Sequence, residues 1–315
     1  MTEKNRIVIY HGPECADGFT AAWLAWRAFG DTAEYIPAQY GDAPPDVTGK
    51  RVHILDFCYP REQLIAMHEK AQTLVLFDHH KDKIKECEGL EYCYFDVTHS
   101  GAWLAWNEFE GLKIEDEDVD YILPPKLVQY VEDRDLWKWE LHNSREINAY
   151  IGTLPKTFHG WDDLHEQVEG LGIHAIVQAG KTVIRQRDQY IRQVSQTAII
   201  RIVNGYDVPV VNASYPFVSE LLHDLAVEHD AVFAVGWFQL ANGNYKYSLR
   251  RNDNWSGHIK GFDLIDLGDL AKIHAETESA LHGRVVSGGG HPAAAGFESR
   301  FSASELWANV PLMAR

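Results

Sequence analysis

The sequence contains little cysteine. Only four of its 315 residues are cysteines, and no two of them form a Cys-x-x-Cys pair. They are Cys15, Cys58, Cys87 and Cys93. A chain of this length can bury a core large enough to fold without covalent links, so a small disulfide-stapled scaffold is excluded. We expect the thiols to be reduced.

Long apolar runs are scarce as well. The first apolar run, from Ile7 to Tyr10, has only the length of a strand, and polar residues and Asp17 follow it. It is too short for a membrane span or for the apolar core of a signal peptide. The sequence therefore predicts a cytoplasmic protein with no membrane partner.

Positive charge is in short supply too. Lys and Arg number 29 against 46 Asp and Glu, which gives a formal net charge of −17. So acidic a chain repels the phosphates of a long duplex, which argues against a general duplex-binding protein. Hydrophobic residues make up 45% of the chain. At roughly 100–200 residues per domain, the chain can form two domains with cores of their own.

The first half of the sequence repeats one pattern, in which a short β-branched or aromatic run ends at an ionisable residue and helix-period sequence follows. The four runs are residues 6–10 before His11, 51–55 before Asp56, 73–77 before Asp78 and 91–95 before Asp96. Continuous apolar strands that alternate with helices are typical of a parallel sheet covered on both faces. Ligands bind beyond the carboxyl ends of such strands, so we expect His11, Asp56 and Asp78 to converge.

The domain organisation follows from the change of pattern along the chain. Helices are predicted over residues 18–29, 61–70, 126–139 and 175–196, and short β runs follow at 208–212, 231–239 and 245–250. We predict an α/β protein. Residues 1–173 form a parallel-sheet, Rossmann-like catalytic domain, 174–200 a helical linker, and 201–315 a smaller mixed α/β domain.

Several fragments combine His and Asp in a way that suits a divalent cation. They are the run from His11 through Cys15 to Asp17, Asp56, the run Asp78-His79-His80, and Asp133. Carboxylates supply charge, and imidazole favours Mn²⁺, Fe²⁺ or Zn²⁺ over Mg²⁺. With the glycine run from Ser287 to Gly296, these motifs in this order resemble the DHH phosphoesterase superfamily and its DHH-associated C-terminal domain. The resemblance spans nearly the whole chain.

The resemblance implies a metal ligand set. His11, Cys15 and Asp56 would hold a first ion, and Asp17, a bridging Asp56, His79 and Asp133 would hold a second. Asp78 and His80 would be catalytic, fixing a tautomer or contacting phosphate. The expected cofactor is Mn²⁺, as one or two ions, with Zn²⁺, Fe²⁺ and Mg²⁺ as alternatives.

Two ligand assignments stay open at this stage. Cys15 stands where many members of the superfamily have aspartate, so it either ligates as a soft thiolate or fills space as a small apolar side chain. Asp135 competes with Asp133 for the last ligand position.

The second domain carries residues that suit an anion. Consecutive glycines let a backbone loop present N–H groups to a phosphate, and an arginine on a neighbouring strand can clamp it. The residues implied by the resemblance to bind substrate are Arg250, Gly288, Gly289, Gly290 and His291. Trp255 either packs in this domain or stacks on a base, and packing is the more frequent role of such a residue.

Together these features predict a metal-dependent phosphoesterase that cuts phosphodiester bonds at the ends of short single-stranded oligonucleotides, as an exonuclease or oligoribonuclease does. One alternative is a phosphatase of nucleotide bisphosphates, cyclic dinucleotides or pyrophosphate. The other is a weakly catalytic nucleotide-binding module. The oligomeric state is left open, with a dimer among the options.

Overall fold

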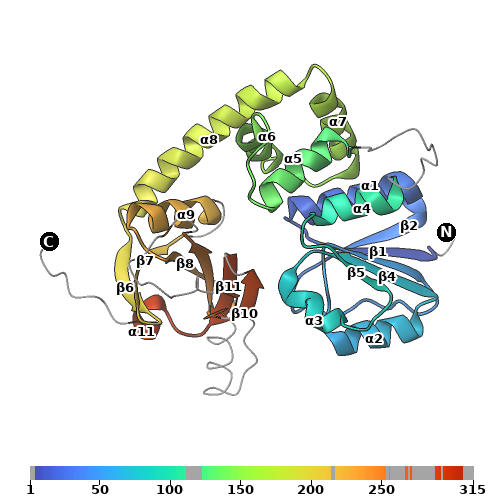
Figure 1. Ribbon diagram of the computed structural model, residues 1–315, viewed down its shortest axis with the longest axis horizontal. Coiled ribbons are helices and arrows are strands. Elements are labelled where there is room, and N and C mark those ends of the chain that lie inside the picture. The colour runs from blue at the N-terminus through green and yellow to red at the C-terminus, as the bar shows by residue number, and fades with distance from the viewer. Residues whose placement is uncertain are drawn as a thin grey trace, which may run out of the picture. The chain divides into compact units, whose positions relative to one another are not determined.

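The chain is an α/β protein of two compact units, Met1–Ile184 and Arg185–Arg315. Figure 1 presents the computed structural model from which they are described. It describes residues 4–110, 123–213, 217–252, 255, 267–268, 270–271, 288–291 and 294–307. The division falls inside helix α8 (Ile173–Ser195), within the stretch predicted as a helical linker.

The first unit is built on a parallel five-stranded sheet, as predicted. Its strands are β1 (Arg6–His11), β2 (Ala33–Ala38), β3 (Arg51–Leu55), β4 (Thr73–Asp78) and β5 (Cys93–Phe95). They lie in the order β2-β1-β3-β4-β5, and every pair is parallel. The sequence patterns missed β2, an edge strand that contains Pro37. Proline donates no ladder hydrogen bond and is therefore found at such edges.

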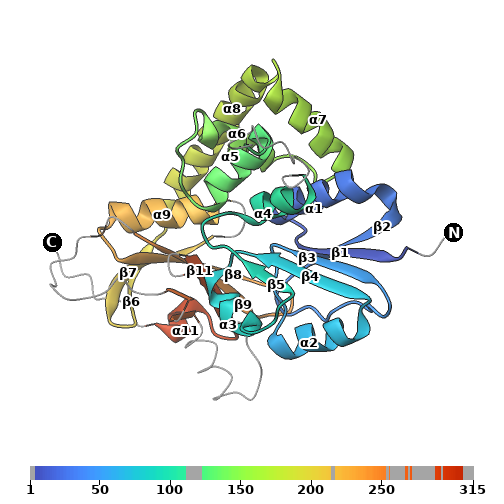
Figure 2. The same cartoon turned by 45° about the vertical axis from the view of Figure 1, so that its right-hand side comes forward.

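Helices cover both faces of this sheet (Figure 2). They are α1 (Ala16–Phe29), α2 (Arg61–Lys70), α3 (Ile84–Cys87) and α4 (Gly101–Phe109), with short 3₁₀ turns η1 (Gly30–Thr32) and η2 (Lys81–Lys83). Alternate residues of each strand face opposite sides. Val8 accordingly packs in the core beneath α1 and α4, whereas Ile7 and Ile9 pack in the core that includes α2 and α3.

A helical subdomain completes the first unit. It contains α5 (Lys126–Asp135), α6 (Ser144–Ile151), α7 (Phe158–Glu169) and the start of α8. The prediction that α5 reaches Trp139 was wrong. The helix ends at Asp135, because Trp137 and Trp139 both take the left-handed conformation with φ of 57°. The subdomain packs on α1 through Trp161, whose Nε1 donates to Thr20 Oγ1 at 3.0 Å.

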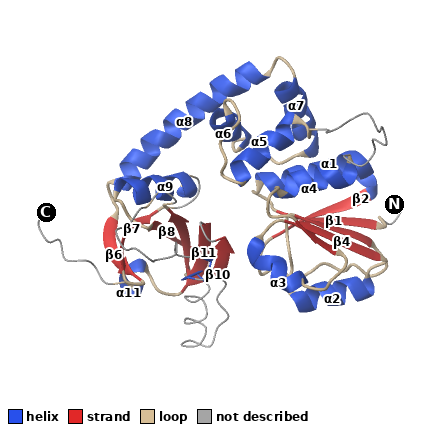
Figure 3. Ribbon diagram, viewed as in Figure 1, coloured by secondary structure: helices blue, strands red, loops and turns tan. Residues whose placement is uncertain are grey.

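The second unit contains a separate mixed sheet (Figure 3). Its strands are β6 (Ile199–Val203), β7 (Tyr206–Asn212), β8 (Phe233–Gln239), β9 (Tyr245–Arg251), β10 (Gly288–His291) and β11 (Ala294–Ser299). They lie in the order β10-β11-β9-β8-β7-β6, with only the β7–β8 pair parallel among these described strands. Two helices, α9 (Val218–Glu228) and α11 (Ala303–Leu306), belong to two distinct apolar clusters of this unit.

Across the described ranges, every helix is too short or too polar to cross a lipid bilayer.

Candidate metal centre

Three neighbouring strands bring their predicted polar residues to one edge of the parallel sheet. His11 ends β1, Asp56 follows β3 and Asp78 ends β4. His11 Nδ1 lies 3.5 Å from Asp56 Oδ2, and His79 Nε2 lies 3.2 Å from Asp56 Oδ1. Asp56 takes a left-handed φ of 55°, which is uncommon for a residue with a side chain and recurs at functional sites.

The start of helix α1 supplies Cys15 and Asp17. Cys15 is the N-cap, and its Sγ accepts from Gly18 N at 3.4 Å while lying 3.5 Å from Asp56 Oδ2. Gly18 allows the helix to approach β1, because a Cβ at that position would lie 2.1 Å from the carbonyl oxygen of His11. The sequence predicted that Cys15 either ligates a metal or packs as a small apolar side chain. It did not predict that Cys15 caps the N-terminus of α1.

The N-terminus of α4 holds Asp17. Gly101 N donates to Asp17 Oδ2 at 2.6 Å, and Ala102 N donates to Asp17 Oδ1 at 2.9 Å. A Cβ at Gly101 would lie 2.4 Å from Asp56 Cβ, so only glycine lets this helix end approach so closely. Free N–H groups and the helix dipole favour a carboxylate at this point. Sequence reasoning missed this role of Gly101.

Asp135, and not Asp133, faces the cluster. Asp135 Oδ2 lies 3.4 Å from His79 Nε2. Asp133 is buried elsewhere and accepts from Glu140 N at 2.8 Å, which orders the turn after α5. Residues two apart on a helix point to nearly opposite sides, so only one of the pair can reach the site. The assignment of Asp133 is corrected to Asp135.

The Asp78-His79-His80 run forms its own hydrogen-bond set. Asp78 is fully buried, and its Oδ1 accepts from His79 N at 2.8 Å. The same oxygen lies 2.7 Å from His80 Nδ1. A proton on Nδ1 that is donated to Asp78 leaves the Nε2 of His80 directed away from this carboxylate, so Asp78 fixes the tautomer and the ring orientation.

The carboxylates of the cluster are crowded and shielded from water. The pKa of Asp17 is raised well above its ordinary value, mainly by burial and to a smaller extent by the charges of Asp56 and Asp135. Burial also raises the pKa of Asp135. At Asp56 burial acts in the same direction, but the hydrogen bonds of His11 and His79 outweigh it and lower the pKa.

His79 balances part of this negative charge. Burial alone would lower its pKa, but the hydrogen bond and charge of Asp56, with Asp135 and Asp17, raise the pKa to about 11. In the absence of a cation, His79 therefore carries a proton at neutral pH. A ligand nitrogen must be deprotonated, so a cation that binds here displaces that proton.

The arrangement fits a divalent cation. Three groups offer ligand atoms within 4.8 Å of one another. They are Asp56-Asp78-His79-His80, His11-Cys15-Asp56 and Asp17-His79-Asp135. Asp78 Oδ2 is buried without a hydrogen-bond partner in the described part of the chain. Buried polar atoms normally have partners, and a cation would supply one.

An aromatic rim that the sequence did not predict borders this cluster. The Tyr40 ring centroid lies 5.6 Å from that of His11 and 6.3 Å from that of His80. The Tyr40 side chain is 43% exposed, and Lys83 Nζ lies 4.7 Å from its ring centroid. Phe57 directly follows Asp56 in the sequence, and its ring centroid lies 5.0 Å from that of Tyr40.

The glycine run of the second unit is a strand and not a loop. Gly288 to His291 form β10, which pairs with β11 from Gly288↔Phe297 to His291↔Ala294. The run is therefore not the glycine loop that we expected, because it is extended and paired with β11. Anion binding by its N–H groups stays a prediction. Ser287, Pro292, Ala293 and the side chain of His291 lie outside the described part.

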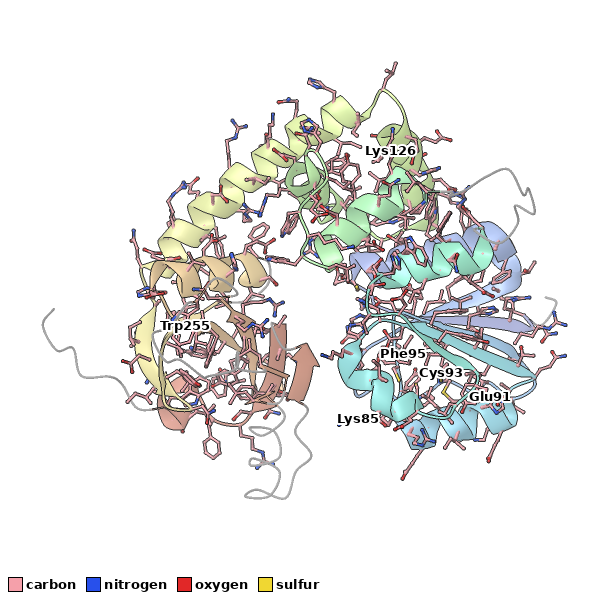
Figure 4. All side chains as sticks on the ribbon, viewed as in Figure 1. Lys85, Glu91, Cys93, Phe95, Lys126 and Trp255 are labelled. Carbon is pink, nitrogen blue, oxygen red and sulfur yellow. The ribbon has the colours of Figure 1, made fainter. Side chains whose placement is uncertain are left out.

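Arg250 and His291 share one cross-strand row. Arg250 pairs with Ala294, which pairs with His291, so their backbones lie two strand spacings or about 10 Å apart. Arg250 Nη2 donates to Ser219 Oγ at 2.8 Å. Substrate binding by this row stays a prediction. Trp255 (Figure 4) packs against the core of this unit, and its Nε1 donates to Asp230 O at 2.9 Å, which favours the packing role.

Comparison with known proteins leaves the family open. No protein-family model matches the chain. An uncharacterized protein of Acanthamoeba polyphaga mimivirus is 25% identical over 181 residues, which cover 51% of this chain and 41% of the viral protein. This chain therefore spans less than half the length of that relative. A solved structure of an uncharacterized protein from Helicobacter pylori G27 has 16% sequence identity and a TM-score of 0.40 over 93% of both chains. The resemblance to DHH phosphoesterases stays a prediction.

Proposed function

We propose that this chain is a divalent-metal-dependent phosphoesterase of the DHH type that hydrolyses phosphodiester bonds at the ends of short single-stranded oligonucleotides. The observation that carries the proposal is the cluster of His, Cys and Asp ligand atoms, in three overlapping groups joined by Asp56 and His79. Overlapping groups of this kind suit two cations that share a carboxylate.

The ligand set can be divided between two ions. His11 and Cys15 would hold one, Asp17 and Asp135 the other, and Asp56 would contact both, with His79 beside Asp135. The mixture of imidazole and carboxylate favours Mn²⁺, and the thiol of Cys15 makes Zn²⁺ or Fe²⁺ acceptable. When bound, such ions acidify water and neutralise charge on phosphoryl oxygens.

The chain's own groups would orient the reaction. Asp78 holds the Nδ1 of His80, so that the Nε2 can contact a phosphoryl oxygen or carry a proton. The α4 N-terminus holds both oxygens of Asp17, so this carboxylate cannot rotate without losing two hydrogen bonds. A fixed carboxylate contributes to catalysis because no reorganisation is needed when charge develops.

A short substrate suits the surroundings of the cluster. The net charge of −17 disfavours a long polyanion, whereas a nucleotide end carries few phosphates. The exposed Tyr40 ring can stack on a base, and Lys83 can contact a phosphate. A cytoplasmic location is part of the same proposal.

The test is a screen of the purified full chain with Mn²⁺ against short RNA, short DNA, a cyclic dinucleotide, a nucleotide bisphosphate and pyrophosphate. We expect Mn²⁺-dependent release of mononucleotides from a short oligonucleotide, and loss of that activity in Asp56→Ala. Preference for a small molecule would replace the substrate assignment. Metal binding without turnover of any phosphoester would overturn the proposed function.

A further inference from the structure

Three of the four cysteines gather in one place that the metal centre does not use. Cys58 lies just after β3, Cys87 ends α3 and Cys93 begins β5. All three belong to, or pack against, the core that includes α2 and α3. The sulfur atoms of Cys58 and Cys87 are 3.6 Å apart. The pairing arises from folding alone, because 29 residues separate the two positions in the sequence.

The cluster differs from thiols that only fill space. Hydrogen bonds from Cys58 and from Cys93 lower the pKa of Cys87, which favours its thiolate. Thiolates, and not thiols, attack peroxides and disulfides. Cys87 is 6% exposed, and Cys93 is partly exposed on the edge strand β5 (Figure 4), so one side of the cluster lies close to the surface of the first unit.

We propose that Cys58 and Cys87 form a reversible oxidation site at which a peroxide converts the two thiols to a disulfide. The Cys87 sulfur attacks one oxygen of hydrogen peroxide, the O–O bond breaks, and the sulfur becomes a sulfenic acid as the first water leaves. The Cys58 sulfur then attacks the Cys87 sulfur, and the sulfenic oxygen leaves as a second water. Two thiols lose two protons and two electrons, and the peroxide gains them.

The site lies beside the metal centre in the chain but is independent of the proposed hydrolysis. Cys58 follows Asp56 by two residues, and Cys87 ends the segment that begins at His79 and His80. Disulfide formation shortens the sulfur separation from 3.6 Å to about 2.05 Å. Closing this gap needs a shift of about 1.5 Å shared by two backbone segments. Intracellular disulfides of this kind are usually transient and redox-sensing.

The test uses the full chain, with chelator present to exclude metal-catalysed oxidation. After treatment with hydrogen peroxide, thiols are counted in denaturant and disulfides are mapped in non-reducing peptide digests. We expect two of the four thiols to disappear, a Cys58–Cys87 crosslinked peptide to form, and dithiothreitol to restore both thiols. The Cys93→Ser variant should still form the Cys58–Cys87 crosslink, and a variant that carries both Cys58→Ser and Cys93→Ser should leave a sulfenic acid at Cys87 that dimedone labels.

Two outcomes would overturn the proposal. One is a crosslink that joins Cys93 to either partner in place of the Cys58–Cys87 pair. The other is the absence of any intramolecular disulfide at a peroxide dose that fully oxidises a small free thiol. Because wild type and Cys93→Ser carry the decisive maps, the test does not depend on whether the double variant folds.

Discussion

At the scale of single residues, the cluster is held by contacts that few other side chains could make. Asp56 is the shared element, since it touches groups from β1, the start of α1 and the segment after β4. Its neighbours are positioned by backbone groups, as Asp17 is by the first turn of α4. The role of such a carboxylate can be tested by an Asp→Asn substitution, which removes the charge and keeps the size of the side chain.

Asp135 and Asp133 form a matched pair for such a test. Asp135→Asn removes a charge 3.4 Å from His79 Nε2, so we expect the affinity for Mn²⁺ to fall at least tenfold, or about 1.4 kcal/mol. Asp133→Asn should leave Mn²⁺ binding close to wild type and lower the melting temperature, because Asp133 orders the turn after α5. Isothermal titration and thermal unfolding measure the two effects, and the reverse pattern would restore Asp133 as the ligand.

Tyr40 tests the rim of the site. If its ring stacks on a base, Tyr40→Ala should lower kcat/KM for a dinucleotide by the equivalent of about 1–3 kcal/mol, and Tyr40→Phe should retain most of the rate. Pyrophosphate, which has no base, provides the control substrate. An equal loss on both substrates in Tyr40→Ala would show that the ring supports the cluster and does not contact a base.

The sequence predicted some site residues and not others for clear physical reasons. His11, Asp56 and Asp78 were found because a strand end in a parallel sheet fixes where its last residue lies. The choice between Asp133 and Asp135 depends on where α5 ends and which way it is rotated, which periodicity does not decide. Tyr40 escaped notice because it follows β2, a strand that the pattern itself did not reveal.

At the scale of elements, the approach of helix ends to the sheet edge decides whether the site forms. Gly18→Ala places a Cβ 2.1 Å from the carbonyl oxygen of His11. Relief of this clash requires a shift of the backbone, which costs more than the movement of a flexible side chain. We expect a loss of about 1–3 kcal/mol in stability and weaker Mn²⁺ binding. Gly152→Ala is the control, because its nearest contact would be 3.5 Å and its φ is −63°. Denaturant unfolding compares the variants, and equal stabilities would refute the close approach.

His53 tests the packing of β3 beneath α1 and α4. It lies against the rings of Phe29 and Phe109, and burial together with the charge of Arg6 lowers its pKa to about 4. An ordinary histidine in the unfolded chain has a pKa near 6.5. Between pH 6.5 and pH 4 the unfolded chain therefore binds a proton at His53, whereas the folded chain does not. The free energy of unfolding is therefore unaffected by His53 titration above pH 6.5 and falls by about 3 kcal/mol as the pH drops to 4.

The comparison variant for His53 is His53→Leu, which removes the titrating group. Unfolding free energies of both proteins are measured by denaturant titration from pH 7 to pH 4. We expect wild type to lose more stability than the variant over this interval, and parallel curves would contradict the depressed pKa.

Elements were predictable where local pattern and long-range pairing agree. The four apolar runs of the first unit all became strands, and α2 has the predicted bounds of Arg61–Lys70. The glycine run failed as a loop prediction because glycine is depleted in strands, whereas here its pairing with β11 stabilises an extended conformation.

At the scale of the whole molecule, each unit has a core of its own, and every residue of the candidate metal centre lies in the first unit. A cation that binds only the folded first unit stabilises it by RT ln(1 + [L]/Kd), or about 2.7 kcal/mol when the free cation exceeds Kd a hundredfold. None of the ligand groups in the described part of the chain belongs to the second unit. Metal removal should therefore weaken one sheet and spare the other.

Hydrogen exchange with and without Mn²⁺ separates the two sheets. We expect Mn²⁺ to slow exchange in peptides from β1, β3 and β4, whose ends carry His11, Asp56 and Asp78, and a chelator to reverse the effect. Peptides from β7, β8 and β9 should exchange at the same rate in both conditions. In Asp56→Ala the Mn²⁺ effect on the first sheet should vanish. Equal slowing in both sheets would contradict a cation effect centred on the candidate site, because every ligand residue of that site lies in the first unit.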